Sequence, residues 1–327
     1  MSNTWEYRFA FRAEDRTDVP PEFRSVYERL RAANAQPVYC LFTPAVKEHT
    51  YIVSRWIPPK LILVFQESIA VLSLDLHSSQ VHAFEQFRND FLGFGLAEFL
   101  LNCWLTLYPG DPSQGPIEVR FPSRAIQHYW ELSGLLLNWC NEEEGSSGTG
   151  FQSLDSLEGL PAKFASFLHS HPELGTILEF FFQPAMEGRA RQEQSFANLL
   201  LLTTSKGIFA LADQHHHGRS EYGIEMTYLP ACRLRTAGWI EPADGKSGVI
   251  EISMHGAATR SRLSWPVYKG LQPYVLRWIQ AVNRSIKVSE QENAPEGGLP
   301  NRNSNESKTC RHPLSESRSP YVSSGRN

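Results

Sequence analysis

The sequence predicts an α+β fold with two tandem small antiparallel β-barrels or sandwiches, each closed by a C-terminal amphipathic helix. Residues 61–75 and 199–213 both have the pattern of a β-hairpin, because two apolar runs flank a short polar turn in each. The elements around the two hairpins recur in the same order, on either side of an acidic and Gly/Ser-rich stretch. Short strands bounded by Pro- and Gly-rich turns are typical of small barrels, and an amphipathic helix can cover the open end of such a barrel.

The chain has 327 residues, enough for two domains of ordinary size, and its 41% apolar content is enough for buried cores. Its net charge of −4 provides no overall attraction to nucleic acid or to an anionic membrane. The five cysteines are scattered without a C-x-x-C pair, which argues against a disulfide framework and a structural zinc site and indicates a reducing compartment. The N-terminal residues lack the apolar segment of a secretory signal, so we expect a cytoplasmic protein.

Residues 1–18 form a polar lead-in, and residues 19–141 are predicted to form the first domain. After Pro20-Pro21 we expect a helix whose apolar side chains share one face: Phe23, Val26, Tyr27 and Leu30. A strand is expected at 38–42 before the hairpin, and another at 117–121 after it. The closing amphipathic helix carries Ile126, Tyr129, Trp130, Leu137 and Cys140.

The secondary structure of residues 81–107 stays open at this point, because Phe84, Phe87 and Phe91 have helical spacing whereas residues 104–108 favour a strand. Residues 91–108 are apolar apart from three polar residues, one of which is Glu98. Their length barely reaches that of a membrane span, and a central carboxylate would cost about 2.5–3.5 kcal/mol. We therefore expect a buried segment here, with membrane association through an exposed amphipathic element as an alternative.

An acidic run followed by a Gly/Ser stretch predicts a solvated linker at 142–159, and residues 160–287 are predicted to form the second domain. Its closing helix carries Val267, Leu271, Tyr274, Val275, Trp278 and Val282, with Pro273 near its start or kinking it. Few apolar residues occur in 288–327, which predicts a disordered tail.

Five pairs of residues mark the repeated order of elements: Phe23 and Phe164, Pro44 and Pro184, Ile69 and Ile208, Ile117 and Ile250, and Trp139 and Trp278. Their separations lie between 133 and 141 residues. This regularity indicates an internal duplication.

The order of residues 199–213, 224–234, 250–254 and the helix ending near Trp278 resembles that of a bacterial pleckstrin-homology-like (PH-like) domain. The resemblance implies a curved barrel capped by its C-terminal helix and used as a binding platform. Members of that family that bind phosphoinositides hold the phosphates with several Lys or Arg residues around the first hairpin turn. The two turns here contain only one such residue, Lys206, so no specific phosphoinositide binding is expected.

The sequence contains no catalytic signature among G-x-S-x-G, G-x-x-x-x-G-K-[ST], G-x-G-x-x-G and H-E-x-x-H. The consecutive residues His215, His216 and His217 are interpreted as a polar loop, because neighbouring side chains on an extended loop diverge and rarely hold one ion. His169 and His171 are interpreted as an exposed helix end.

Two further groups of charged residues receive ordinary structural interpretations. Asp75 and Asp213 end the two hairpins, where Asp is a usual turn residue. Arg233 and Arg235 would share one face of a strand near Trp239, and the segment 260–262 is also basic, but a solvent-exposed face is favoured over a nucleic-acid surface.

The sequence therefore predicts no catalytic, cofactor-binding or metal-binding residue and no cofactor. The preferred hypothesis is a non-enzymatic tandem-domain scaffold that binds a protein partner, since linking two binding modules raises avidity. Specific nucleic-acid binding, specific phosphoinositide binding and membrane contact are not expected. The alternatives are an enzyme with a non-contiguous site in the cleft between the halves, and a peripheral membrane-associated protein.

Overall fold

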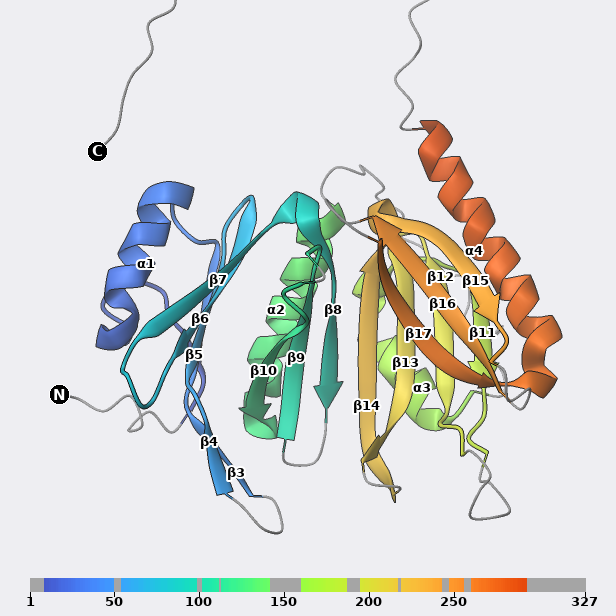
Figure 1. The fold of residues 1–327 in the computed structure, drawn as a ribbon, viewed down its shortest axis with the longest axis horizontal. Coiled ribbons are helices and arrows are strands. Elements are labelled where there is room, and N and C mark those ends of the chain that lie inside the picture. The colour runs from blue at the N-terminus through green and yellow to red at the C-terminus, as the bar shows by residue number, and fades with distance from the viewer. Residues whose placement is uncertain are drawn as a thin grey trace, which may run out of the picture. The chain divides into compact units, whose positions relative to one another are not determined.

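A computed structural model describes residues 9–49, 54–98, 102–111, 113–141, 160–186, 195–216, 219–242, 247–255 and 260–292. The chain is α+β, with a few helices and several antiparallel sheets (Figure 1). None of the sheets formed by the described strands closes into a barrel. Residues 1–292 belong to one compact unit, and residues 293–327 lie outside the described part.

The first half begins with a helix packed on a sheet in the order β1-β2-β5-β6-β7. These elements are β1 (Phe11–Arg12), α1 (Pro21–Asn34), β2 (Tyr39–Thr43), β5 (Lys60–Val64), β6 (Ser68–Leu74) and β7 (Val81–Phe87). A separate hairpin joins β3 (Val46–His49) and β4 (Ser54–Ile57). The first half ends with a 3-10 helix, three strands, a second 3-10 helix and a closing helix. These elements are η2 (Arg88–Asp90), β8 (Phe91–Glu98), β9 (Asn102–Pro109), β10 (Ile117–Pro122), η3 (Ser123–Ala125) and α2 (Ile126–Asn141).

The second half repeats the order of helix, four antiparallel strands, 3-10 helix, three antiparallel strands, 3-10 helix and closing helix. Its first part contains α3 (Ala162–Ser170), the short 3-10 helix η5 (Pro172–Leu174), β11 (Ile177–Gln183), β12 (Leu199–Thr204), β13 (Gly207–His216) and β14 (Arg219–Pro230). Its second part contains η6 (Ala231–Arg233), β15 (Leu234–Ile240), β16 (Ser247–His255), β17 (Arg260–Tyr268), η7 (Lys269–Leu271) and α4 (Gln272–Glu292).

Three of the residue pairs expected from the sequence occupy equivalent places. The backbone N–H groups of Phe23 and Phe164 donate to Pro20 and Pro161, each over 2.9 Å, and both phenyl rings are fully buried. Ile208 in β13 faces Thr203 across its hairpin as Ile69 in β6 faces Val64. Pro44 and Pro184 each follow the last residue of the corresponding strand, β2 or β11.

The other two pairs are wrong in register. Ile117 lies on the last strand before a closing helix, whereas Ile250 lies on β16, the middle strand of its set. Trp139 stands near the end of α2, but Trp278 stands in the first half of α4. Shared apolar character made these residues similar in sequence, although it does not fix their position in a strand or helix.

The structure also determines or corrects several local expectations. Residues 81–107 contribute β7, β8 and β9, so the helical spacing of the three phenylalanines has no helix behind it. Val267 lies in β17, because α4 begins only at Gln272, and Pro273 is close to that start. Helix α4 continues through Glu292, past the expected boundary at residue 287. The expected linker 142–159 lies outside the described residues.

One seven-stranded sheet joins the two halves, in the order β10-β9-β8-β14-β13-β12-β11. Strand β14 of the second half pairs antiparallel with β8 of the first, with Tyr228 opposite Phe94 and Met226 opposite Leu96. Helix α2 packs into the core on which both halves converge, since Leu136 belongs to the same buried cluster as Phe164 of α3. The halves therefore share a sheet and a hydrophobic core, and we call the contact between β8 and β14 the internal junction.

Candidate interaction surfaces and a pocket beside α2

A small pocket opens beside α2, where the helix faces the second half. It is lined by Phe94, Trp130, Ser133, Gly134, Leu137, His171, Glu173, Leu174, Phe209 and Met226. Its empty volume is about 240 Å³ including the part open to solvent. The space that water-sized molecules can occupy in it is only about 10 Å³, far below the roughly 300–1,000 Å³ of typical small-molecule sites.

Two polar features lie at this pocket. The Ser133 hydroxyl is buried and has no hydrogen-bond partner within the described part of the chain. His171 Nδ1 lies 2.7 Å from Glu173 Oε1, and the imidazole ring packs 4.2 Å from the Trp130 ring and 4.5 Å from the Phe167 ring, centroid to centroid. These contacts fix the orientation of the imidazole.

The electrostatic setting of Glu173 has two opposing parts. Burial acts to raise the pKa of its carboxyl group, but the hydrogen bond with His171 and smaller contributions outweigh burial and leave the pKa below its usual value. The carboxylate is therefore held in its charged form. A group meant to donate or accept protons near neutral pH would need the opposite shift.

Sequence reasoning missed this pocket, although a signal was present. Ser133 and Gly134 interrupt the apolar face of α2 between Trp130 and Leu137, which stand three or four residues away on the same face. Small residues in an otherwise large apolar stripe leave space above them. The position of His171 beside that space depends on α3 and η5, which no local pattern places there.

The outer edge of β15 is a second feature, because no strand of the described part pairs with it. Helix α4 covers part of this edge through Asn283. Its side-chain oxygen accepts from the backbone N–H of Ala237 at 2.9 Å, and its side-chain nitrogen donates to the carbonyl of Ala237 at 2.9 Å. One amide side chain thus satisfies both backbone groups, as a neighbouring strand would.

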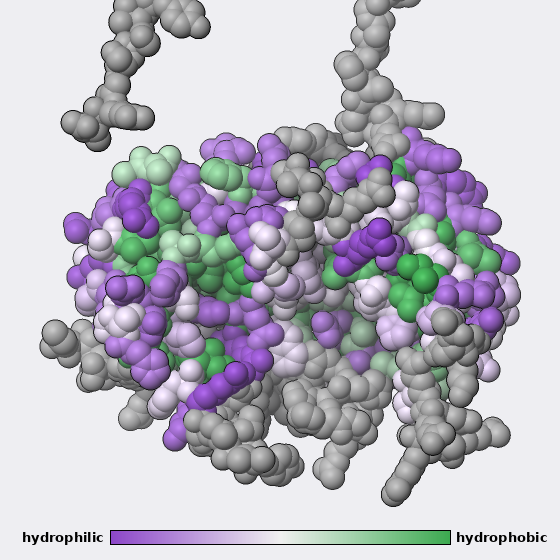
Figure 2. All heavy atoms as spheres, in the orientation of Figure 1, coloured by the Kyte–Doolittle hydropathy of each residue, from purple (hydrophilic) through white to green (hydrophobic). Residues whose placement is uncertain are grey.

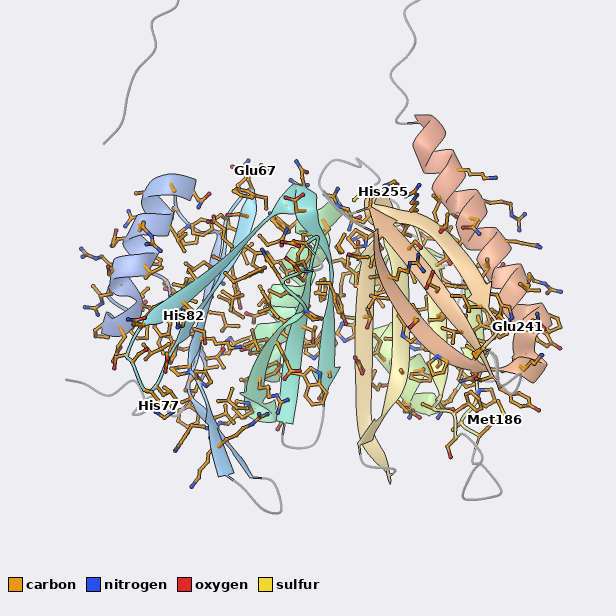
Figure 3. All side chains as sticks on the ribbon, viewed as in Figure 1. Glu67, His77, His82, Met186, Glu241 and His255 are labelled. Atoms are coloured by element: carbon orange, nitrogen blue, oxygen red, sulfur yellow. The ribbon has the colours of Figure 1, made fainter. Side chains whose placement is uncertain are left out.

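A third feature is a set of exposed side chains near the start of α4, which we call the α4-start patch: Ile240, Tyr268 and Tyr274, whose exposed fractions are 43%, 44% and 62%. Polar residues border this α4-start patch, since Glu241 accepts from Gln272 at 3.1 Å and pairs with Lys269 at 3.7 Å. Glu241 lies beside the first turn of α4 (Figure 3). Apolar surface mixed with polar residues extends over β15, β16 and β17 (Figure 2).

His215 and His216 do not lie in the expected loop. Strand β13 runs through His216, and its backbone pairs His215 with Ser220 and His216 with Arg219. His217 lies outside the described residues. Among the residues that are described, no group of three or more His, Cys, Asp or Glu side chains could hold a metal ion.

The two hairpin aspartates have different surroundings. Asp75 accepts from the backbone N–H groups of His77 and Ser78, which is the expected turn role. Asp213 is buried instead, forms an ion pair with Lys163 and accepts a hydrogen bond from Asn198. This cluster ties α3 to the second hairpin.

The end of α3 agrees in part with expectation. His169 and Ser170 hydrogen-bond to the carbonyl groups four residues earlier, as expected of a helix end, whereas His171 turns into the pocket. Arg233 belongs to η6 and donates to the carbonyl of Arg88 at 3.0 Å, so it does not share a strand face with Arg235. Arg262 pairs with Glu251 at 3.2 Å.

The described residues of the apolar segment 91–108 belong to β8 and β9, and their apolar side chains are mostly buried. Within the described residues, no helix is both long and apolar enough to span a membrane. Neither a protein-family model nor a curated protein matches the chain.

Proposed function

We propose that the protein is a non-catalytic cytoplasmic scaffold that consists of two PH-like modules and binds a protein partner through the α4-start patch. The observation that carries the proposal is the exposure of two tyrosines and an isoleucine on segments near the start of α4, where Glu241 contacts Lys269 and Gln272. Aromatic side chains, tyrosine in particular, are enriched among the residues that dominate binding energy at protein interfaces.

The arrangement of strands supports the PH-like part of the proposal. The second half has four antiparallel strands, then three, then a helix whose apolar face is buried, and the first half has the same order with β1 and the β3-β4 hairpin in addition. In the second half, Val275, Trp278 and Val282 of α4 join the buried cluster that contains Ile250 and Ile252 of β16. The resemblance implies a curved barrel capped by its C-terminal helix; the closing helix supports that part of the proposal, whereas none of the sheets formed by the described strands closes into a barrel.

The pocket beside α2 supports catalysis less well than the patch supports binding. The pocket is small, its carboxylate is held charged, and its unpaired hydroxyl is enclosed. An enzyme site would need titratable groups whose pKa values are tuned toward the working pH.

The test is affinity purification from an extract of the native host, with the full-length chain as bait and quantitative mass spectrometry as the readout. The variant pair Tyr268→Ala with Tyr274→Ala should lose a partner that the wild-type chain retains. Loss of about 2 kcal/mol at an interface corresponds to roughly 30-fold weaker binding. Val38→Ala is the matched control, because Val38 is 53% exposed but lies in the first half. Identical protein sets for wild type and the double variant would refute the proposal.

A further inference from the structure

The internal junction uses one strand edge from each half, and the equivalent strand in the opposite half has no strand on that edge within the described residues. Strand β14 is the last strand before η6 in the second half, and β8 is the first strand after η2 in the first half. The equivalents left over are β7 in the first half and β15 in the second. Neither has a strand on its outer side within the described part of the chain. In Figure 3, His82 on β7 and Glu241 near β15 lie on opposite sides of the view.

Strand β15 is built like β8. Each follows a 3-10 helix, and each has a bulge after its first residue, between Phe91 and Gly93 in β8 and between Leu234 and Thr236 in β15. Each also has a glycine two residues after the bulge, Gly95 or Gly238. At Gly95 an added Cβ would lie 3.4 Å from the carbonyl oxygen of Met226 in β14, whereas at Gly238 it would meet nothing within 4 Å. Gly238 therefore has no strand backbone beside it of the kind that β14 places beside Gly95, although α4 covers the neighbouring Ala237 through Asn283.

The closing helices differ at one matching position. Leu137 is the twelfth residue of α2 and Asn283 is the twelfth residue of α4. Beside Leu137, the backbone of Phe94 pairs with β14. Beside Asn283, the backbone of Ala237 bonds to the Asn283 amide instead. The amide thus occupies the place that a strand takes at the internal junction.

We propose that the outer edge of β15 accepts β7 of a second copy of this chain, in the register of the internal junction, and that Asn283 competes for the same backbone groups. If β7 pairs with β15 as β14 pairs with β8, Glu85 lies opposite Ala237, Phe84 lies opposite Gly238 and Ala83 lies opposite Trp239. The largest side chains then face small ones on both strands, which suits cross-strand packing. Because the two edges differ, each chain offers one donor and one acceptor edge, so association is head to tail. The Asn283 amide keeps this association weak in the wild-type chain.

The experiment is sedimentation velocity of the full chain over a range of concentrations. Asn283→Leu introduces the residue found at the internal junction and should lower the dissociation constant of self-association by about tenfold or more relative to wild type. Adding Ala83→Pro should reverse this gain. Ala83 corresponds to Met226 of the internal junction, so its N–H points away from β6 and a proline there removes only the outer donor. Ala83→Thr keeps the N–H and is the matched control.

Two outcomes overturn the inference: Asn283→Leu associates no more strongly than wild type, or Asn283→Leu associates and Ala83→Pro does not reduce it. The second outcome would identify non-specific aggregation. The double variant at Tyr268 and Tyr274 should leave self-association unchanged, which separates this surface from the α4-start patch.

Discussion

Replacing Gly93 by Ala should weaken the internal junction. Gly93 follows the bulge of β8 and has a φ of +143°, a backbone conformation that side chains rarely adopt. A Cβ at this position would overlap the carbonyl oxygen of Tyr228 in β14. The substitution therefore acts on the pairing between β8 and β14.

Two costs determine the expected magnitude. Holding a residue with a side chain at a φ normally restricted to glycine costs about 1–3 kcal/mol. Moving the carbonyl of β14 away from the new Cβ costs about 1–3 kcal/mol more, as in overpacked cores. The expected loss in the free energy of unfolding is about 2–6 kcal/mol, and each kcal/mol lowers the melting temperature by roughly 2–4 °C in a domain of comparable size.

Thermal unfolding followed by far-ultraviolet circular dichroism measures this loss, and two further glycines separate its causes. Gly115→Ala has a φ of +64° but open space around the new Cβ, so only the backbone cost of about 1–2 kcal/mol applies. Gly238→Ala has neither a positive φ nor a neighbour and should be nearly neutral. If Gly93→Ala unfolds at the same temperature as Gly115→Ala, the close approach of β14 to Gly93 does not contribute to stability.

Two other substitutions test charged side chains that have a polar partner in the structure. Asp213→Ala should lower the free energy of unfolding by about 1–3 kcal/mol in urea denaturation, because it leaves Lys163, whose side chain is 39% exposed, without its ion-pair partner beside a buried hairpin. An equal loss in Asp75→Ala, at an exposed turn, would contradict this reasoning. Glu173→Gln should be less stable than wild type at neutral pH, and the difference should shrink as the pH falls below about 4.3, the ordinary pKa of Glu. The folded-state pKa of Glu173 is lowered through its hydrogen bond with His171, so this contribution is present above the unfolded-state pKa and is lost as the carboxylate is protonated; a difference independent of pH would refute it.

Local patterns in the sequence determined which segments become helices and hairpins. The hairpin of β12 and β13 turns within the short polar segment expected from the sequence, and its connection is Ser205-Lys206, since Thr204 faces Gly207 across it. The Pro20 and Pro161 helix starts also follow from the sequence alone, since proline at a helix start and an apolar face at helical spacing are both local properties. The helical spacing of Phe84, Phe87 and Phe91 is also a local property, but it does not indicate a helix here, because those residues belong to two strands separated by η2.

The sequence by itself thus determined the repeated order of elements, and three of the five matched residue pairs, from hydrophobic period and turn residues. Only the tertiary structure decided how the halves meet: Tyr228 faces Phe94 across 134 positions of the chain, and no local pattern specifies that pairing. A strand's alternation of buried and exposed residues tells which face it buries but says nothing of which strand lies beside its edge. The same limit hid the different surroundings of β8 and β15, which share their bulge and their glycine but differ in whether a strand or the Asn283 amide satisfies the outer backbone groups.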